Sequence, residues 1–158
     1  MVSGGTRLEG FLHRHHRIGL DTCLFIYQVE ANARYLPWVN TIFAWVEEPR
    51  HSAVTSTVTL LELLVQPYRK GDIDRADQIY ALFSTYPHLE WIVPTLEIAD
   101  HAARLRAEHN LRTPDALQVA TAAASQATAL ITNDNAFERV AGLDVLILDQ
   151  LLSADGNC

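Results

Sequence analysis

Five short apolar segments alternate with helical patterns along the sequence, and this alternation constrains the fold more than any other feature. The segments are Ile18–Asp21, Ser52–Thr55, Trp91–Val93, Ala129–Thr132 and Val145–Leu148. Short apolar strands separated by helices are typical of a parallel sheet that is covered on both faces. We therefore predict an α/β domain with a five-stranded, mainly parallel sheet.

Helical patterns fill the intervals between these segments. We expect helices over residues 24–29, 36–46, 58–65, 96–109 and 115–126, with a further helix that begins after Asp72. Pro67 should end the third of these helices, because proline disfavours α geometry in the residue before it. Asp72 suits a helix N-cap, and Pro114 stands at the favoured first position of a helix.

The chain has 158 residues, a length at which one domain can fold without disulfides or a metal ion. We expect this domain over residues 17–152, with residues 1–16 as a solvated lead-in and residues 153–158 as a C-terminal tail. The run His13–Arg17 could also be a metal-binding tract or a nucleic-acid-binding arm. Two cysteines and the absence of a long apolar segment predict a soluble, cytoplasmic protein without a membrane partner.

Four acidic residues lie where a parallel sheet would gather them. Ligands of such sheets bind outside the carboxyl ends of the strands. Asp21 ends the first apolar segment, and Asp134 follows the fourth. Asp115 lies in the first turn of its helix, and Glu62 lies about two turns into the helix after the second strand. We expect these four carboxylates to converge on one edge of the sheet.

Structural roles are the alternative for three of these acids. Asp21 could cap the next helix, Asp115 could favour a helix dipole, and Asp134 could shape a turn. Glu62 is harder to explain in this way, because its helix face is at least half apolar and no lysine or arginine lies within four residues. A carboxylate in such surroundings is costly unless a cation compensates it.

Clustered acids without neighbouring histidine or cysteine ligands suit a hard cation such as Mg²⁺ or Mn²⁺. Next to a phosphate, such an ion can orient or deprotonate a water molecule and stabilise charge on the leaving oxygen. The pattern therefore favours phosphodiester hydrolysis. Nineteen acids against twelve bases give a net charge of -7, which excludes a broadly basic nucleic-acid-binding protein. A metal site would offset part of that negative charge.

Basic residues near the predicted site are candidates for contacts with a phosphate. Arg112 stands three residues before Asp115, and Arg139 lies on the segment that follows Asp134. Arginine suits bidentate phosphate contacts. A solvated arginine is the alternative for both positions.

Four short motifs surround the four acids and occur in a fixed order. They are Leu20–Thr22, Thr59–Leu63, Arg112–Leu117 with Ala120–Ala122, and Ile131–Asp134 with Phe137. Together they resemble the PIN domain, and most closely the VapC-type toxins of bacterial toxin–antitoxin pairs, over residues 17 to about 150. The resemblance implies an α/β/α sandwich and a Mg²⁺- or Mn²⁺-dependent endoribonuclease. It also implies a homodimer, an RNA substrate and a small antitoxin that blocks the site.

The resemblance assigns roles to individual residues. It carries metal binding and catalysis onto Asp21, Glu62, Asp115 and Asp134, and it makes Thr132 a polar residue that helps to order the site. Many relatives have asparagine where this chain has Cys23. A thiol is a poorer hydrogen-bond partner, so the support of the metal can differ here. We do not expect Cys23 to be a ligand, because Mg²⁺ avoids sulfur.

The helix expected over residues 36–46 is apolar around roughly half of its circumference, which is wider than the stripe that one core face requires. Its side chains include Trp38 and Trp45. We interpret the extra width as a second contact, with a dimer mate or an antitoxin segment. A deeper position in the core is the alternative. Tyr27 is a further candidate for the same groove.

Other functions fit the sequence less well. A phosphatase with Asp21 as nucleophile would need a second aspartate two residues later, where Cys23 stands. A nicotinamide-binding domain would need a G-x-G-x-x-G motif after the first strand. The remaining alternative is a non-catalytic PIN-like scaffold that binds RNA or a protein partner.

Overall fold

The sheet at the centre of the fold consists of five parallel strands. The computed structural model describes residues 4–155, with side chains through Leu152. The strands are β1 Arg17–Leu20, β2 Ser52–Ser56, β3 Leu89–Ile92, β4 Ala129–Thr132 and β5 Asp144–Ile147. Their order is β3-β2-β1-β4-β5, and every neighbouring pair is parallel. The prediction of an α/β fold with a five-stranded parallel sheet is confirmed.

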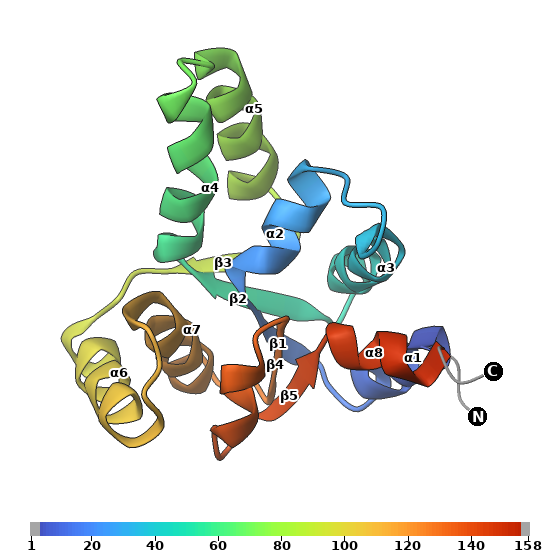
Figure 1. Cartoon of the computed structure of the whole chain (residues 1–158), viewed down its shortest axis with the longest axis vertical. Coiled ribbons are helices and arrows are strands. Elements are labelled where there is room, and N and C mark those ends of the chain that lie inside the picture. The colour runs from blue at the N-terminus through green and yellow to red at the C-terminus, as the bar shows by residue number, and fades with distance from the viewer. Residues whose placement is uncertain (1–3, 156–158) are drawn as a thin grey trace.

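Helices cover both faces of this sheet. They are α1 Gly4–His13, α2 Thr22–Val29, α3 Leu36–Glu47, α4 Thr57–Arg69, α5 Ile73–Ser84, α6 Leu96–His109, α7 Thr113–Ala124 and α8 Asp149–Asp155, with a 3₁₀ helix η1 at Asn135–Arg139. Helices α6 and α7 lie on one side of the sheet, and α2 and α3 lie on the other (Figure 1). The α4–α5 pair projects beyond the rest of the domain. No helix in residues 4–155 is long and apolar enough to cross a membrane.

Strand β1 lies between the two apolar cores. Ile18 and Leu20 are buried in the core that also contains α2 and α3. Gly19 points to the other face, where an added Cβ would lie 2.8 Å from the Cβ of Ala122. Because glycine permits this close approach, α7 packs directly against β1. The packing brings the start of α7, with Asp115, toward the carboxyl end of β1.

The N-terminal segment is part of the folded domain, so the prediction of a solvated lead-in is wrong for residues 4–13. Helix α1 buries Leu8, Phe11 and Leu12 in the core next to α3 and α8. The short apolar pattern of α1 was too weak to predict this packing, because its burial depends on partners remote in sequence. At the other end, α8 continues through Asp155. The remainder of the expected lead-in and tail, residues 1–3 and 156–158, lies outside the described residues.

The histidine and arginine run after α1 makes contacts within the domain. His15 is buried, and its two ring nitrogens lie 2.7 Å from Thr128 Oγ1 and 2.7 Å from Asp144 Oδ2. Arg17 donates to the carbonyl of Ser125 and pairs with Glu90. These residues therefore connect the start of β1 with the amino ends of β3, β4 and β5.

Helix α3 uses its wide apolar surface inside the chain, so the interpretation as a groove for another protein is wrong. Trp45 is only 7% exposed and stacks on His51, with ring centroids 4.1 Å apart. Trp38 is partly buried against the same core. The surface is covered by α1, α2 and β2, so the alternative of a deeper core position holds.

Helix α4 runs past Pro67, where we expected it to end. Pro67 is buried within the last turn of α4, and its carbonyl accepts a hydrogen bond from the amide of Asp72. Proline has no amide hydrogen, so Pro67 leaves one intrahelical hydrogen bond unformed. The helix nevertheless continues for two residues beyond Pro67.

Candidate active site

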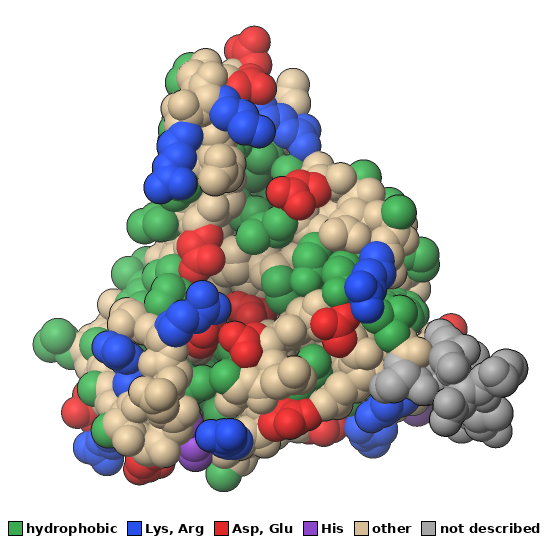
Figure 2. Space-filling view, viewed as in Figure 1, with side chains coloured by type: hydrophobic (Ala, Val, Ile, Leu, Met, Phe, Trp, Pro, Cys, Tyr) green, Lys and Arg blue, Asp and Glu red, His purple; other side chains and the backbone are tan. Residues whose placement is uncertain are grey.

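The four carboxylates that the sequence singles out line one cavity at the carboxyl ends of the strands. Its volume is about 240 Å³. The lining residues are Asp21, Thr22, Cys23, Ile26, Tyr27, Glu62, Arg112, Asp115, Asn133 and Asp134. Figure 2 shows acidic side chains gathered in the hollow below the projecting α4–α5 pair, with basic side chains beside them. The structure thus brings together residues that are more than 100 positions apart in the sequence.

Asp21 and Asp115 are the least exposed of the four acids, with 8% and 7% of their surface exposed. Asp21 has a structural role as well. It caps α2, because its Oδ1 accepts a hydrogen bond of 2.8 Å from the amide of Thr22. Its Oδ2 accepts a hydrogen bond of 2.7 Å from the hydroxyl of Thr132. A carboxylate oxygen can accept more than one bond, so the cap does not exhaust either oxygen. The capping role and a role in the cavity are therefore compatible.

Thr132 connects two of the acids. Its hydroxyl donates to Asp21, and its oxygen accepts a hydrogen bond of 3.1 Å from the amide of Asp134. Asp134 in turn caps η1, since its Oδ1 accepts from the amide of Ala136 at 2.9 Å. The end of β4 therefore fixes Asp134 relative to Asp21.

Burial and mutual repulsion weaken the acidity of three of the carboxyl groups. Burial raises the pKa of Asp21 to about 6, the charges of Asp115 and Glu62 add to the rise, and the hydrogen bonds from Thr132 and Thr22 oppose it. Burial and the charge of Asp115 raise the pKa of Glu62. Burial also raises the pKa of Asp115, although Arg112 opposes that rise. Among the described residues, the lining also has four acids and only one arginine, so the ionised carboxylates exceed the positive charge beside them.

Arg112 is the basic residue at this cavity. Its Nε donates to Asp115 Oδ2 at 2.9 Å, and a terminal nitrogen lies 3.6 Å from Asp134 Oδ2. The side chain of Arg112 is 77% exposed, so these ion pairs are screened by water and hold it weakly. Arg112 is therefore placed where predicted, but it pairs with the acids. Arg139, the second candidate, does not line the cavity.

A buried polar cluster lies behind the acids, and the sequence did not single it out. Gln118 donates to Thr59 Oγ1 at 2.6 Å, and Thr59 is 3.0 Å from Thr22 Oγ1 and 2.7 Å from Thr55 Oγ1. Thr55 donates to the carbonyl of Leu20. These bonds join β1, β2, α2, α4 and α7 just below the site.

Helical spacing was the signal that could have revealed this cluster. Thr59 stands three residues before Glu62, and Gln118 stands three residues after Asp115, so each shares a helix face with an acid. A polar residue on an otherwise buried face points to a hydrogen-bond network. The cluster therefore positions the helices that carry Glu62 and Asp115.

Cys23 lines the cavity from the first turn of α2. Burial and the charge of Asp21 raise the pKa of the Cys23 thiol above its ordinary value. The thiol therefore stays protonated at neutral pH, which makes it a poor metal ligand.

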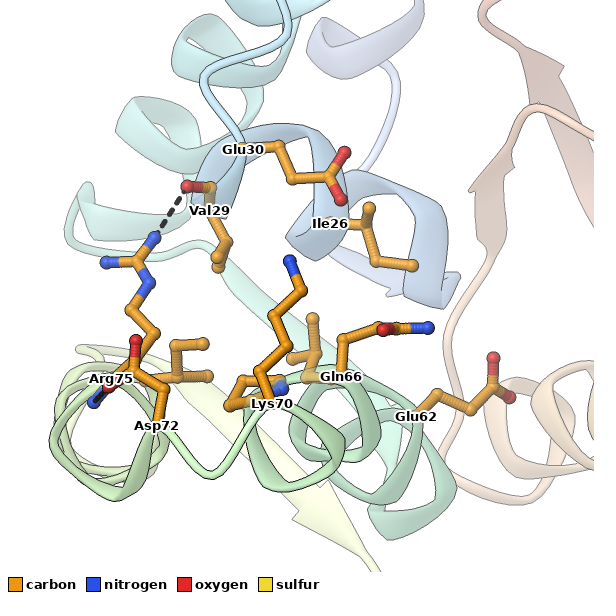
Figure 3. Close-up of a pocket in the computed structure, with 11 residues that line it drawn as sticks. Ile26, Val29, Glu30, Glu62, Gln66, Lys70, Asp72 and Arg75 are labelled. Carbon is orange, nitrogen blue, oxygen red and sulfur yellow. Dashed lines mark hydrogen bonds between the residues drawn. The ribbon is translucent and has the colours of Figure 1, made fainter.

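A second hollow continues from the acids into the space between α2 and the α4–α5 pair. Its volume is about 320 Å³, and it shares Ile26 and Glu62 with the acid-lined cavity. Figure 3 shows Glu62 at one end and Arg75 at the other, where Arg75 donates to the carbonyl of Val29 at 2.8 Å. The lining combines apolar side chains with charges of both signs. We call it the α2–α4 groove.

The chemistry of the site fits a divalent cation. All four acids offer oxygen ligands, which Mg²⁺ and Mn²⁺ prefer, and only one arginine of the described chain lines the cavity beside them. Within residues 4–155, however, no three acidic, histidine or cysteine side chains are already arranged to hold an ion. Arg112 provides the positive charge between Asp115 and Asp134, and a cation there would have to replace it.

Comparison with known proteins identifies the family to which this fold belongs. The model of the PIN domain family matches residues 18–143. No curated protein matches the sequence. Among solved structures, a DNA-bound VapBC from Salmonella typhimurium is 19% identical, with a TM-score of 0.65 over 84% of this chain and 98% of that one.

Two Mycobacterium tuberculosis structures are also similar. VapC20, described as a toxin that cleaves the sarcin–ricin loop, is 17% identical, with a TM-score of 0.63 over 81% of this chain and 98% of that one. VapBC-5, described as a member of the VapBC family of toxin–antitoxin systems, is 25% identical, with a TM-score of 0.53 over 84% of this chain and 97% of that one. The family match covers most of the sequence and all four acids, and on this basis the chain belongs to the PIN domain family.

Proposed function

We propose that the protein is a Mg²⁺- or Mn²⁺-dependent endoribonuclease that acts as the toxin of a VapC-type toxin–antitoxin pair. The observation that carries the proposal is the meeting of four carboxylates, from four separate segments, in one cavity with uncompensated negative charge. The similarity to VapC20, a toxin that cleaves an RNA loop by its description, supports RNA as the substrate. The reaction would take place in the cytoplasm.

In this proposal each residue at the cavity has a separate task. The cation would be held by Asp21, Glu62, Asp115 and Asp134. Thr132 fixes the position of Asp21 relative to Asp134 through its two hydrogen bonds. When bound, the ion would activate water for attack on phosphorus and stabilise charge on the leaving oxygen. Arg112, released from Asp115, would contact the substrate phosphate, and its exposed side chain can make that movement at low cost.

We also propose an antitoxin as the partner, as in the VapBC structures that resemble this chain. The α2–α4 groove is the surface we assign to it. Ile26, Val29 and Pro67 offer apolar contacts, while Glu30 and Lys70 offer charges of both signs, a combination that suits a peptide better than RNA. Because the groove opens onto Glu62, a segment bound there would block access to the acids.

A homodimer completes the proposal. The exposed apolar side chains of Leu61, Val93 and Leu96 are available for contact with a second copy. Sedimentation of the purified chain measures its oligomeric state. Replacement of Leu61 and Leu96 by serine should favour the monomer if these residues form the interface.

The direct test is cleavage of an unstructured RNA by the purified protein with Mg²⁺ or Mn²⁺. EDTA should abolish cleavage, and a return of the metal should restore it. Asp21→Asn and Asp115→Asn should be inactive but folded, while Asp144→Asn, an acid at the opposite edge of the sheet, serves as the matched control. Cleavage that EDTA does not reduce would contradict the metal role.

The same assay separates the nuclease from a non-catalytic scaffold. A scaffold would bind RNA without cutting it, and Asp21→Asn would then leave RNA binding unchanged. Sequencing of the RNA ends produced on induced expression, with Asp21→Asn as the control, would identify the target.

A further inference from the structure

An aromatic side chain that no catalytic role uses forms part of the wall of the acid-lined cavity. Tyr27, in the last turn of α2, lines this cavity together with the acids and Asn133. It is partly buried, and its hydroxyl accepts a hydrogen bond of 3.0 Å from Asn133 Nδ2. Asn133 therefore holds the hydroxyl in place, and the ring of Tyr27 is available for contact with a ligand.

The orientation of this ring is fixed by a second tyrosine. Tyr27 stacks on Tyr35, with ring centroids 4.2 Å apart and planes inclined by 18°. Tyr35 is 8% exposed, and its hydroxyl donates to Asp149 Oδ1 at 2.6 Å. Tyr35 thus covers one face of the Tyr27 ring, and the partly buried Tyr27 side chain contributes to the cavity wall.

Asn133 links the aromatic pair to the acids. Its Oδ1 accepts a hydrogen bond of 2.7 Å from the amide of Asp149, while its Nδ2 holds Tyr27. Asn133 lies between Thr132 and Asp134 in the sequence. The position of the Tyr27 ring is therefore coupled to the two acids that Thr132 connects. A ring held in this way loses little conformational entropy when a ligand binds.

The chemistry of this wall selects a flat, π-rich group next to a phosphate. In single-stranded RNA each phosphate is flanked by nucleobases that can leave their stack and pack on an aromatic side chain. We propose that Tyr27 is the stacking platform for a nucleobase adjacent to the phosphate in the acid-lined cavity. This inference rests on the proposed ribonuclease function, and it specifies single-stranded RNA as the substrate class.

The contribution of one stacked base, about 1–3 kcal/mol, corresponds to roughly 5- to 150-fold in affinity. Tyr27→Leu should therefore raise the KM for RNA by this factor and leave kcat close to its original value. Tyr27→Phe keeps the ring and should restore most of the affinity. Tyr80→Leu, at an exposed tyrosine of α5 outside the cavity, is the matched control and should change nothing.

Binding can be measured separately from cleavage. In the Asp21→Asn background, short single-stranded RNAs that carry 2-aminopurine at each position in turn should show quenched fluorescence at one position. The quenching should be lost with Tyr27→Leu and kept with Tyr27→Phe. Unchanged fluorescence at every position would overturn the stacking role.

Abasic RNA distinguishes stacking from support of the fold. An abasic site at the stacked position should weaken cleavage by the wild-type protein as much as Tyr27→Leu does, and the two changes together should cost no more than either alone. If Tyr27→Leu lowers cleavage of abasic RNA by the full factor, Tyr27 supports the fold of the site and does not stack on a base. If the wild-type protein cleaves RNA and Tyr27→Leu is indistinguishable from it, the inference fails and the ribonuclease stands; if the wild-type protein cuts no RNA, both fail.

Discussion

The two ends of the central sheet differ in how far their acidic residues are paired with basic ones. At the amino ends of the strands, His15 and Arg14 both contact Asp144, and Arg17 pairs with Glu90. At the carboxyl ends, Arg112 serves two acids, and no ion pair is found for Asp21 or Glu62 in the part of the chain that the structure describes. One end compensates its charges and stabilises the fold. The other retains an excess of negative charge, at a cost in stability.

The pKa values reflect the same contrast. Burial raises the pKa of Asp144, but the hydrogen bonds from His15 and Arg14 outweigh that effect, and the pKa is lowered overall. For Asp21, burial and the neighbouring acids prevail, and the pKa rises to about 6. Uncompensated acids collected in a cavity are typical of a site that binds a cation or a reacting group. The comparison therefore separates charges that hold the fold together from charges kept for function.

The largest expected effect comes from removal of the Asp21 carboxylate. Asp21→Asn should lower RNA cleavage at least about 100-fold, because it removes a metal ligand. The fold should survive, since the amide oxygen can still accept the bond from Thr22, and the Thr132 hydroxyl can accept a bond from the amide NH2 in place of donating one. Cleavage rates and thermal unfolding of the variant check both parts. A variant that is inactive because it is unfolded would show that Asp21 is needed for the fold, which contradicts the contrast between the two ends of the sheet.

Metal-free protein should lose stability as the pH rises from about 4 to about 6. The folded protein keeps the Asp21 proton up to a pKa of about 6, whereas the unfolded chain releases it near 3.8. Between these two values the folded state binds more protons than the unfolded state. The free energy of unfolding therefore falls as the pH rises through this interval. The loss amounts to about 3 kcal/mol. Urea unfolding at several pH values in EDTA measures the slope, and Asp21→Asn should flatten it.

Addition of Mn²⁺ should reverse this loss. A cation that binds only the folded state adds about 2.7 kcal/mol at 100 times its Kd. The rise in Tm should be larger at pH 7.5 than at pH 5, because protons compete with the metal for the same carboxylates. Asp21→Asn should abolish most of the rise. An equal effect of Mn²⁺ on both proteins would place the ion elsewhere.

At the opposite end of the sheet, His15→Ala should reduce stability and leave activity intact. The variant loses the hydrogen bonds to Thr128 and Asp144 from a buried ring, a cost of about 2 kcal/mol. Urea unfolding measures the loss, and RNA cleavage below the unfolding transition should match that of the wild type. A drop in cleavage by the folded variant would show that the two ends are coupled.

The smallest effect is expected for Arg112→Gln. Loss of an exposed ion pair of about 0.5–1 kcal/mol should tighten Mn²⁺ binding two- to fivefold, because the arginine no longer competes for Asp115 and Asp134. The KM for RNA should rise at the same time, since a phosphate contact is lost. Titration calorimetry and steady-state kinetics measure the two changes. Weaker metal binding would show that Arg112 supports the ion and does not compete with it.

Much of the fold was predictable because the pattern of local sequence was unambiguous. The apolar segments that became β1 and β4 are short, continuous and bounded by polar residues, so their strands were predicted to within one residue. Helix α1 was missed because Leu8 and Phe11 are too few to form a clear pattern without their partners in α3 and α8. The same omission led to the wrong interpretation of α3, whose extra apolar surface is covered by α1.

By itself, the sequence determined the alternation of the five strands with the helices between them and the positions of the four acids, because both follow from local periodicity and from where a parallel sheet ends its strands. Only the tertiary structure decided how those acids are held. The bond between Thr132 and Asp21, the reach of Arg112 to two carboxylates and the stacking of Tyr27 on Tyr35 all depend on side-chain geometry between remote segments. Distances of a few ångströms set these interactions, and sequence spacing does not encode them.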